Sequence, residues 1–436
     1  MAFKDAFKQY WLDTGTLNVR RFKRFVLSAP FWILIIAAAL IATGIIRYNI
    51  LIDNRPEQYM ADIWSQESNV SYRQLSVFAR GVRSTGTLPV LLSGADVSIT
   101  RADVATMRKE LQGIVDSSKG GKSAGLTDDG SPRGWEDAYS TFFDTSVYRA
   151  DLDGEPKDSD RIDAQIVAVG GNYGLFHPFI YMSGGFLQDR CVDPDQIVLN
   201  DALAWRLFKS YDITGRRIVL DGHEFIVSGV VREYDSSIDR EVEALEPRAY
   251  IYFNALEVLV ADELSTMSAA PADATAAAPG GASTGSASDA SSSTSSSTPT
   301  ALAISCYEVM LPEIVEGVAN TDIKSVLPGY TETNPKYYVL SNTERFGVLK
   351  VWDYMIPFGE TSVQLNGYEM PYWERACQIT YVHLFVDMVL VFAGSFLLVV
   401  GVAASVLRWR KKDFDIIVPE EETEDSEEET ALAVVN

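Results

Sequence analysis

The chain has 436 residues, of which 47% are hydrophobic, enough for two or three domains with sizeable cores. It contains 60 Asp and Glu residues against 37 Lys and Arg residues, which gives a formal net charge of -23 at pH 7. Because proteins bind nucleic acids largely through Lys and Arg that neutralise phosphates, this balance argues against a nucleic-acid partner.

Residues 1–28 begin with an amphipathic pattern and form the first predicted segment. Four aromatic residues recur at helical spacing with two lysines beside them: Phe3, Phe7, Tyr10, Trp11, Lys4 and Lys8. Such a segment suits the inner surface of a membrane. A short amphipathic helix packed on protein has the same periodicity, so both interpretations stay open.

Two long apolar runs predict transmembrane helices at 29–51 and 381–408. The first, PFWILIIAAALIATGII, carries no charge, and at about 1.5 Å per residue it nearly crosses a hydrocarbon core of about 30 Å. The second contains His383 and Asp387, which lie four residues apart and so share one helix face. We interpret this pair as reaching the interface or contacting another helix, with a proton-relay role as the alternative.

The second apolar run also contains Gly394 and Gly401 among other small residues. Small side chains let helix backbones approach closely in a membrane, which predicts a surface where another helix packs. Small residues that are merely tolerated in a lipid-facing helix are the alternative.

Basic residues flank both apolar runs on the sides facing the chain termini: Arg20, Arg21, Lys23 and Arg24, then Arg408, Arg410, Lys411 and Lys412. The positive-inside rule then places both termini in the cytoplasm and the region between the runs outside a plasma or inner membrane. A cleaved signal peptide is the alternative for the first run. The long basic lead disfavours it, as does RYNILIDNRP, which lacks a small-residue cleavage pattern.

The outer region shows both helix and strand signals. Residues Ile99 to Ile114 repeat apolar residues at helical spacing, and Thr100 with Asp103 resembles a capping box. Four β-branched runs read as strands: QIVAVGG, QIVLN, RIVLDG and FIVSGVV. DALAWRLF predicts a short helix that Asn200 or Asp201 caps. The fold class is therefore an α+β extracytoplasmic domain between two transmembrane helices, in two parts, 52–268 and 301–380.

Residues 269–300 separate these two parts and consist almost entirely of Ala, Ser, Thr, Gly, Pro and Asp. Such a segment cannot bury enough surface to offset its chain entropy, which predicts a disordered insertion. Strand-like PRAYIYF precedes it and ALAISCYEVML follows it. We therefore expect the insertion to join two strands of one sheet rather than two domains.

The three cysteines, Cys191, Cys306 and Cys377, all fall in the outer region, where disulfides can persist. Three cannot all pair within one chain. Cys191 with Cys306 is the predicted disulfide, because Cys377 sits beside the membrane, and three free thiols are the alternative. The spacing of the cysteines suggests no metal site, and we expect no cofactor.

Residues 409–436 form a tail that is first basic and then strongly acidic. Its glutamates include Glu420, Glu421, Glu422, Glu427, Glu428 and Glu429. A run of like charge repels itself and stays solvated. The tail is therefore either a solubilising end or a docking strip for a basic cytoplasmic partner.

Candidate catalytic residues are few in the outer region, and we expect no enzyme. Its two histidines are His177, in LFHPF, and His223, in a predicted hairpin turn, and we interpret them as packed or solvated side chains. The run Gly121-Lys122-Ser123 lacks the earlier glycine of a nucleotide-binding loop, because Asp116 occupies that position.

The stretch from Asp195 to Val231 resembles the MacB-like periplasmic core domain of FtsX/MacB-type ABC transporter permeases. The matching parts are Ile197-Val198-Leu199, Leu203-Ala204, Leu207-Phe208, Gly215-Arg216 and Val227-Ser228-Gly229-Val230-Val231. Weaker likeness extends upstream through ITRADVATMRKEL and downstream into SCYEVMLP. As in that family, these residues are expected to be structural and not catalytic.

The resemblance implies a non-enzymatic membrane subunit or accessory of an ABC-type transport or envelope complex, whose outer domain mediates assembly or mechanical coupling. Permeases of this kind continue into three further helices, which are here reduced to one span and a tail, and no ATPase domain is present. The implied partners are an ABC ATPase and a polytopic permease or a second copy of the chain. The alternative is a stand-alone cell-envelope receptor or scaffold that binds a protein or cell-wall ligand.

Overall fold

The computed structural model describes residues 28–66, 70–86, 88–94, 98–118, 134–151, 156–188, 193–234, 236–241, 246–261, 264, 301–313, 315–332, 337–356 and 368–414. Its contacts divide the chain into two compact units. The helical unit comprises Met1–Ile52 and His383–Asn436, and the outer domain comprises Asp53–Val382.

The helical unit contains α2 (Ala29–Asp53) and, from His383 on, α12 (Tyr372–Phe414). Both helices are long and apolar enough to cross a membrane. Two candidate spans therefore flank the outer domain in the chain, as the hydropathy predicted. Most side chains in their apolar windows are exposed, which suits helices that face lipid.

The outer domain is built on one ten-stranded sheet, with the order β14-β1-β13-β5-β6-β11-β8-β10-β7 and with β9 pairing both β10 and β5. β6 and β8 pair in parallel with β11 and β10, respectively, and the other pairs are antiparallel. The strands are β1 (Tyr72–Phe78), β5 (Glu136–Arg149), β6 (Ile162–Gly171), β7 (Ile180–Gly184), β8 (Gln196–Asn200), β9 (Arg217–Leu220), β10 (His223–Arg232), β11 (Arg248–Tyr252), β13 (Cys306–Pro312) and β14 (Tyr338–Ser341).

Two small antiparallel pairs complete the strands: β2 (Val82–Arg83) with β3 (Leu91–Leu92), and β4 (Ile99–Thr100) with β12 (Ala303–Ile304). The helices of the domain are α3 (Met60–Gln66), α4 (Arg101–Ser118), α5 (Tyr173–Phe176), α6 (Asp201–Phe208), α7 (Ser237–Glu241), α8 (Phe253–Leu259), α10 (Val318–Val326), α11 (Val348–Met355) and the 3-10 turns η1 (Pro56–Gln58) and η2 (Asp158–Asp160).

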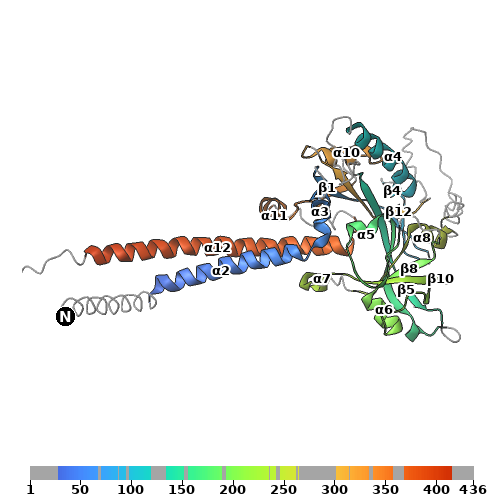
Figure 1. Cartoon of the computed structure of the whole chain (residues 1–436), viewed down its shortest axis with the longest axis horizontal. Coiled ribbons are helices and arrows are strands. Elements are labelled where there is room, and N and C mark those ends of the chain that lie inside the picture. Colours follow the sequence, from blue (N-terminus) through green and yellow to red (C-terminus); the bar gives the residue numbers. More distant parts are fainter. Residues whose placement is uncertain are drawn as a thin grey trace, which may run out of the picture. The chain divides into compact units, whose positions relative to one another are not determined.

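Each face of the large sheet has its own core, because successive strand side chains point to opposite faces. In β6, Ile166 and Ala168 join one core while Val167 and Val169 join the other. The first core is covered by α4, α6, α8 and α10. α4 packs on α10 near one end of the sheet, and α6 lies near the other (Figure 1). The second core is covered by α3, α5 and residues 368–373.

The predicted helices in this region are confirmed together with their caps. At the start of α4, the backbone N–H of Thr100 donates to Asp103, and the hydroxyl of Thr100 accepts from the backbone N–H of Asp103. α6 begins after Asn200, whose Oδ1 accepts from the N–H of Leu203 at 2.9 Å, so Asn200 is the cap. Local sequence signals therefore decide where both helices begin.

The strands on either side of the predicted insertion belong to one sheet, as expected. β11 and β13 are not neighbours, because β6 and β5 lie between them. The sequence analysis missed α8, which directly follows β11. The insertion 269–300, the amphipathic segment in 1–27, Gly121-Lys122-Ser123 and the acidic tail lie outside the described residues, and their predictions stay open.

Candidate functional site

The first turns of α12, from Tyr372 to Val382, belong to the outer domain, and we call the buried polar groups around them the anchor site. The anchor site contains three Arg–carboxylate pairs that are almost fully enclosed. Buried charges are costly unless they are paired and hydrogen-bonded, and each of these three pairs meets both conditions.

Arg248 of β11 forms the first pair and is 1% exposed. Its Nη1 donates to Glu233 at 2.5 Å, and its guanidinium lies 3.6 Å from the ring centre of Tyr372, the first residue of α12. Tyr250 donates to the same carboxylate at 2.6 Å, and its hydroxyl lies 3.1 Å from that of Tyr372. Alternation in the strand PRAYIYF places Arg248 and Tyr250 on one side of the sheet, facing α12.

The pKa shifts of Arg248 and Tyr250 show how strongly both depend on the Glu233 carboxylate. Burial alone would lower the pKa of Arg248, but the carboxylate of Glu233 and the neighbouring tyrosines raise it above its ordinary value. Burial, and then Glu233, raise the pKa of Tyr250. Arg248 is therefore charged and Tyr250 neutral at any physiological pH.

Arg345 and Glu374 form the second pair, with side chains that are 2% and 4% exposed. The guanidinium donates to both carboxylate oxygens, at 2.7 and 2.9 Å, in the bidentate geometry that favours a strong ion pair. Its Nε donates to the Tyr381 hydroxyl at 3.2 Å. Glu374 and Tyr381 are two turns apart on α12, so Arg345 binds this helix at two points along its length.

Arg55 and Asp239 form the third pair, at 2.7 Å. Arg55 follows α2 in the chain and also donates to Ser236 and to Thr380 of α12, at 3.3 Å each. Asp239 caps the turn at Ser236 by accepting from its backbone N–H. The two chain segments that connect the domain to the apolar helices are thus joined at this residue.

His177 directly follows α5, lies beside the anchor site and is 5% exposed. Its Nε2 is 2.5 Å from Glu308 of β13, and its ring centre lies 4.3 Å from that of Trp373 on α12. The sequence predicted a packed or solvated histidine here, and the structure shows a packed one. His223 is exposed in the hairpin between β9 and β10, so the two histidines of the outer region do not come together.

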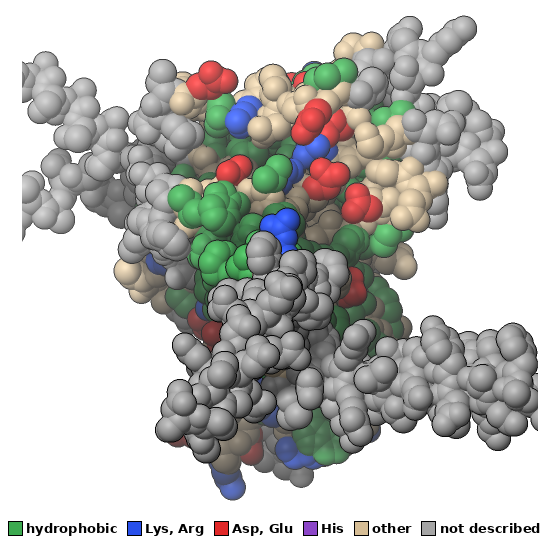
Figure 2. All heavy atoms as spheres, turned by 90° about the vertical axis from the view of Figure 1, so that its left-hand side faces the viewer, with side chains coloured by type: hydrophobic (Ala, Val, Ile, Leu, Met, Phe, Trp, Pro, Cys, Tyr) green, Lys and Arg blue, Asp and Glu red, His purple; other side chains and the backbone are tan. Residues whose placement is uncertain are grey.

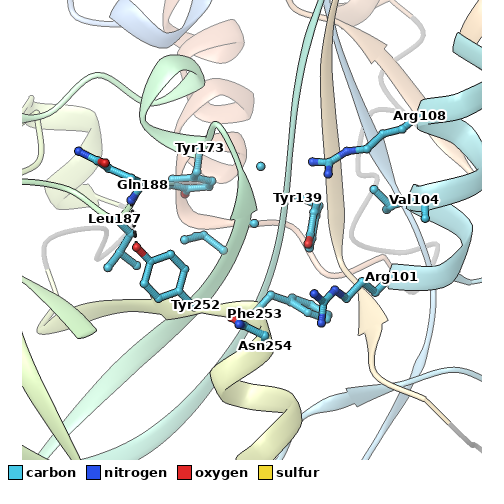
Figure 3. A pocket seen from close by; sticks show the side chains of 14 residues that line it. Arg101, Val104, Arg108, Tyr139, Tyr173, Leu187, Gln188, Tyr252, Phe253 and Asn254 are labelled. Carbon is cyan, nitrogen blue, oxygen red and sulfur yellow. Dashed lines mark hydrogen bonds between the residues drawn. The ribbon is translucent and has the colours of Figure 1, made fainter. Parts of the chain in front are cut away.

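A pocket of roughly 490 Å³ lies beside α4 and α8 (Figure 3), and its lining residue Tyr173 also contacts the rings of Tyr250 and Trp373. Arg101 and Arg108 line it from α4, with Tyr139, Tyr173 and Tyr252 around them. Arg108 is bound by Asp137 at 2.7 and 2.8 Å, and Arg101 pairs with Glu257, so both guanidinium charges are balanced. Among the described residues the buried Tyr173 hydroxyl has no hydrogen-bond partner. A ligand in this pocket would therefore meet polar side chains but no unbalanced positive charge from Arg101 or Arg108.

The described residues do not show a catalytic arrangement. Among them, no group of three or more His, Cys, Asp or Glu side chains is placed to hold a metal ion. On the face drawn in Figure 2, coloured basic side chains alternate with acidic and hydrophobic ones. Binding to a phosphate backbone would favour a basic stripe instead.

Gly394 and Gly401 of α12 lie against α2 of the same chain. A Cβ added to Gly394 would stand 2.8 Å from Ile41 Cγ1, and one added to Gly401 would stand 2.9 Å from Leu34 Cδ2. On the same pair of helices, Asp387 forms an ion pair with Arg47 at 3.1 Å. The small-residue surface and the membrane carboxylate are therefore used within the chain, which favours helix contact over a proton relay for Asp387.

The predicted Cys191–Cys306 disulfide stays a prediction, because Cys191 lies outside the described residues. Cys306 is fully buried on β13 and forms no disulfide within the described part of the chain. Burial, and then the carboxylates of Glu308 and Glu374, raise the pKa of the Cys306 thiol. Strand alternation turns the Cys306 side chain into the second core.

Sequence reasoning missed the three Arg–carboxylate pairs, whose members are far apart in the chain. One weak signal was present: Arg248 stands inside the strand-like run PRAYIYF, where a charged residue at a core position needs a partner. Arg345 and Glu374 stand in segments with no comparable pattern.

Comparison with known proteins gives several similar solved structures, two of which follow. The extracellular domain of the noncanonic ABC-type transporter YknZ from Gram-positive bacteria is 12% identical, over 61% of this chain and 99% of that one, with a TM-score of 0.34. The periplasmic region of MacB from Actinobacillus actinomycetemcomitans is 11% identical, over 64% and 92% of the two chains, with a TM-score of 0.35. Among curated proteins, none matches.

The family comparison covers residues 64–290, which the model of the MacB-like periplasmic core domain matches. This range includes the strands and helices from β1 to α8 and three charged residues of the anchor site, Glu233, Asp239 and Arg248. The resemblance seen from Asp195 to Val231 is thereby confirmed. The chain is a membrane protein that belongs to the family of the MacB-like periplasmic core domain.

Proposed function

We propose that the chain is a non-enzymatic membrane subunit of an ABC-type transport or envelope complex, in which α12 couples the membrane helices mechanically to the outer domain. In this proposal both termini lie in the cytoplasm and the domain lies outside. The basic residues that flank the two apolar helices support this orientation.

The observation that carries the proposal is the anchor site on α12. The helix runs without interruption from Tyr372 to Phe414, and its first turns are enclosed in the domain by Arg345 and by the ring contact of Arg248 with Tyr372. A shift or rotation of α12 would have to break these buried contacts or move the domain with it. Removing one partner of a buried pair costs about 3–5 kcal/mol, so moving the domain is the easier response.

The partners in this proposal are an ABC ATPase and a polytopic permease or a second copy of the chain. Membership of a domain family named for a transporter supports this kind of partner. Because α2 already covers Gly394 and Gly401, a partner helix would contact the outward side of α12. Phe396 and Val399 lie on that side and are 69% and 65% exposed.

Affinity purification of the full-length chain from its own membranes in mild detergent tests the proposal. We expect an ATPase and a polytopic permease to be recovered with it. A Phe396→Ala and Val399→Ala variant should lose these partners, while the same changes at two exposed domain residues, Trp205 and Val258, should keep them. A chain that purifies alone at full stability would refute the assignment to a complex.

A receptor for a small ligand is the second candidate, and the pocket beside α4 favours it. Tyr173 lines this pocket, and its buried hydroxyl has no hydrogen-bond partner among the described residues, so a small rearrangement would let it bind a polar ligand. Under this alternative the chain purifies without ATPase, and a Tyr173→Phe variant loses thermal stabilisation by cell-wall extracts. Under the proposed function, Tyr173→Phe leaves partner recovery unchanged.

A further inference from the structure

α11 (Val348–Met355), with the residue after it, is apolar around most of its circumference, but the domain covers only part of it. Val351 faces the domain and is fully buried. Four large apolar residues point away from the domain: Val348, Leu349, Trp352 and Ile356, which are 53%, 78%, 42% and 40% exposed. At about 100° per residue, these four fall within an arc of about 100°. We call them the outer face of α11.

The polar residues of α11 leave the outer face uninterrupted. Lys350 and Asp353 are exposed and lie on the flank between the outer face and Tyr354. Single exposed apolar residues are ordinary on protein surfaces, but a contiguous patch marks an interaction. Four such residues within nine positions make α11 a patch of this kind.

Contacts within the domain hold α11 beside Tyr381 of α12. Tyr354 of α11 stacks on Tyr381 with ring centres 4.1 Å apart and an interplanar angle of 20°. Phe346, just before α11, lies 5.2 Å from the same ring. Tyr381 also donates to the carbonyl of Arg345 at 3.2 Å. α11 is therefore held at the level of Tyr381.

Tyr381 directly precedes the apolar stretch of α12, which begins at Val382. The next charged group, Asp387, follows six residues later, about 9 Å along the helix. The headgroup layer of a bilayer adds about 5–8 Å to each side of the hydrocarbon core. The level of Tyr381, and with it α11, therefore corresponds to the membrane surface.

We propose that the outer face of α11 inserts into the lipid surface where α12 enters the bilayer. Amphipathic helices at a membrane surface bury their apolar side by about 5–10 Å at the headgroup boundary, and Trp and Tyr concentrate there. Trp352, Tyr354 and Tyr381 match this preference. The insertion supports the domain against tilting and gives it a second membrane contact besides its spans.

Photo-crosslinking in native membranes tests which molecule touches the outer face. The photoreactive residue p-benzoylphenylalanine replaces Leu349 in the full-length chain, and in a matched control it replaces Lys350, which points about 100° away on the same helix. We expect a lipid adduct at position 349, identified by mass spectrometry of the labelled peptide. The control with the photoreactive residue at position 350 should give no lipid adduct. A polypeptide adduct at 349, whether to a second copy or to another subunit, or no adduct at 349 overturns the proposal.

A second measurement does not depend on crosslinking. The protein is reconstituted into vesicles whose lipids carry bromine on the acyl chains, and its tryptophan fluorescence is compared with that of a Trp352→Phe variant. The difference between the two isolates Trp352 from the other tryptophans of the chain, which has eight in all. We expect this difference signal to be quenched by brominated lipid. A difference signal that brominated lipid leaves unchanged contradicts insertion.

Discussion

Replacing Arg345 by Met should destabilise the outer domain far more than an ordinary loss of a charge. The change leaves Glu374 buried, 4% exposed, without the guanidinium that donates to both of its oxygens. Breaking a buried pair in this way costs about 3–5 kcal/mol. At about 2 °C per kcal/mol for a domain of this size, the midpoint of thermal unfolding should fall by about 6–10 °C.

The assay is thermal unfolding of the full-length chain in lipid nanodiscs, followed by tryptophan fluorescence. The matched control is Arg217→Met, which removes the exposed pair with Glu224, whose two side chains are 63% and 56% exposed. Such surface pairs contribute under about 1 kcal/mol. A combined Arg345→Met and Glu374→Leu variant should regain much of the loss, because no unpaired charge remains. If Arg345→Met lowers the unfolding midpoint no further than Arg217→Met does, the Arg345–Glu374 pair does not hold α12 in the domain.

Three further predictions concern other parts of the chain. Cys306 should resist iodoacetamide at pH 8 and react only after denaturation without reductant. Labelling only after reduction would show a disulfide instead. Because the pKa of the Cys306 thiol is raised in the folded domain, the stability of the domain should decline as the pH rises above about 8.5, the pKa of a free thiol. Gly394→Leu should lower the unfolding temperature by overpacking against Ile41, at about 1–3 kcal/mol, whereas Val399→Leu on the exposed side should not, and equal effects would contradict the helix packing. Asn200→Ala should cost about 1–2 kcal/mol by removing the cap of α6, measured by urea unfolding, and an unchanged midpoint would refute that role.

The elements that could be predicted from the sequence carry their signal locally. α4 repeats apolar residues at helical spacing and begins with Thr100 and Asp103, and the apolar lengths of α2 and α12 identify both helices without any tertiary information. The strands β6, β8, β9 and β10 show β-branched runs that contain or are followed by Gly, Asn or Asp. In these segments local preference and tertiary structure agree, which is why the predictions succeeded.

The anchor site could not be predicted because its pairs form only in the folded domain. Arg55 and Asp239 are 184 residues apart in the chain, and nothing near either residue indicates the other. Arg345 and Glu374 stand closer, but the 357–367 segment between them gives no periodic signal that would bring them together. The order of the ten strands likewise depends on pairings over long sequence distances. The short helices α8 and α11 were missed because seven or eight residues give little periodicity and because neither has a side-chain cap of the kind that Asn200 gives α6.

The central claim is that α12 transmits movement between the membrane helices and the outer domain of an ABC-type complex. Hydrogen–deuterium exchange of the co-purified complex, with and without ATP, tests it most directly. One variant carries Val382→Gly with His383→Gly, which weakens the helix where it leaves the domain, and its control carries Ala at both positions. The account predicts an ATP-dependent change in exchange around Arg248 and Glu374 in the natural chain and the Ala control, and its loss in the Gly variant. No ATP-dependent change in the natural chain, or an equal change in the Gly variant, would contradict the account.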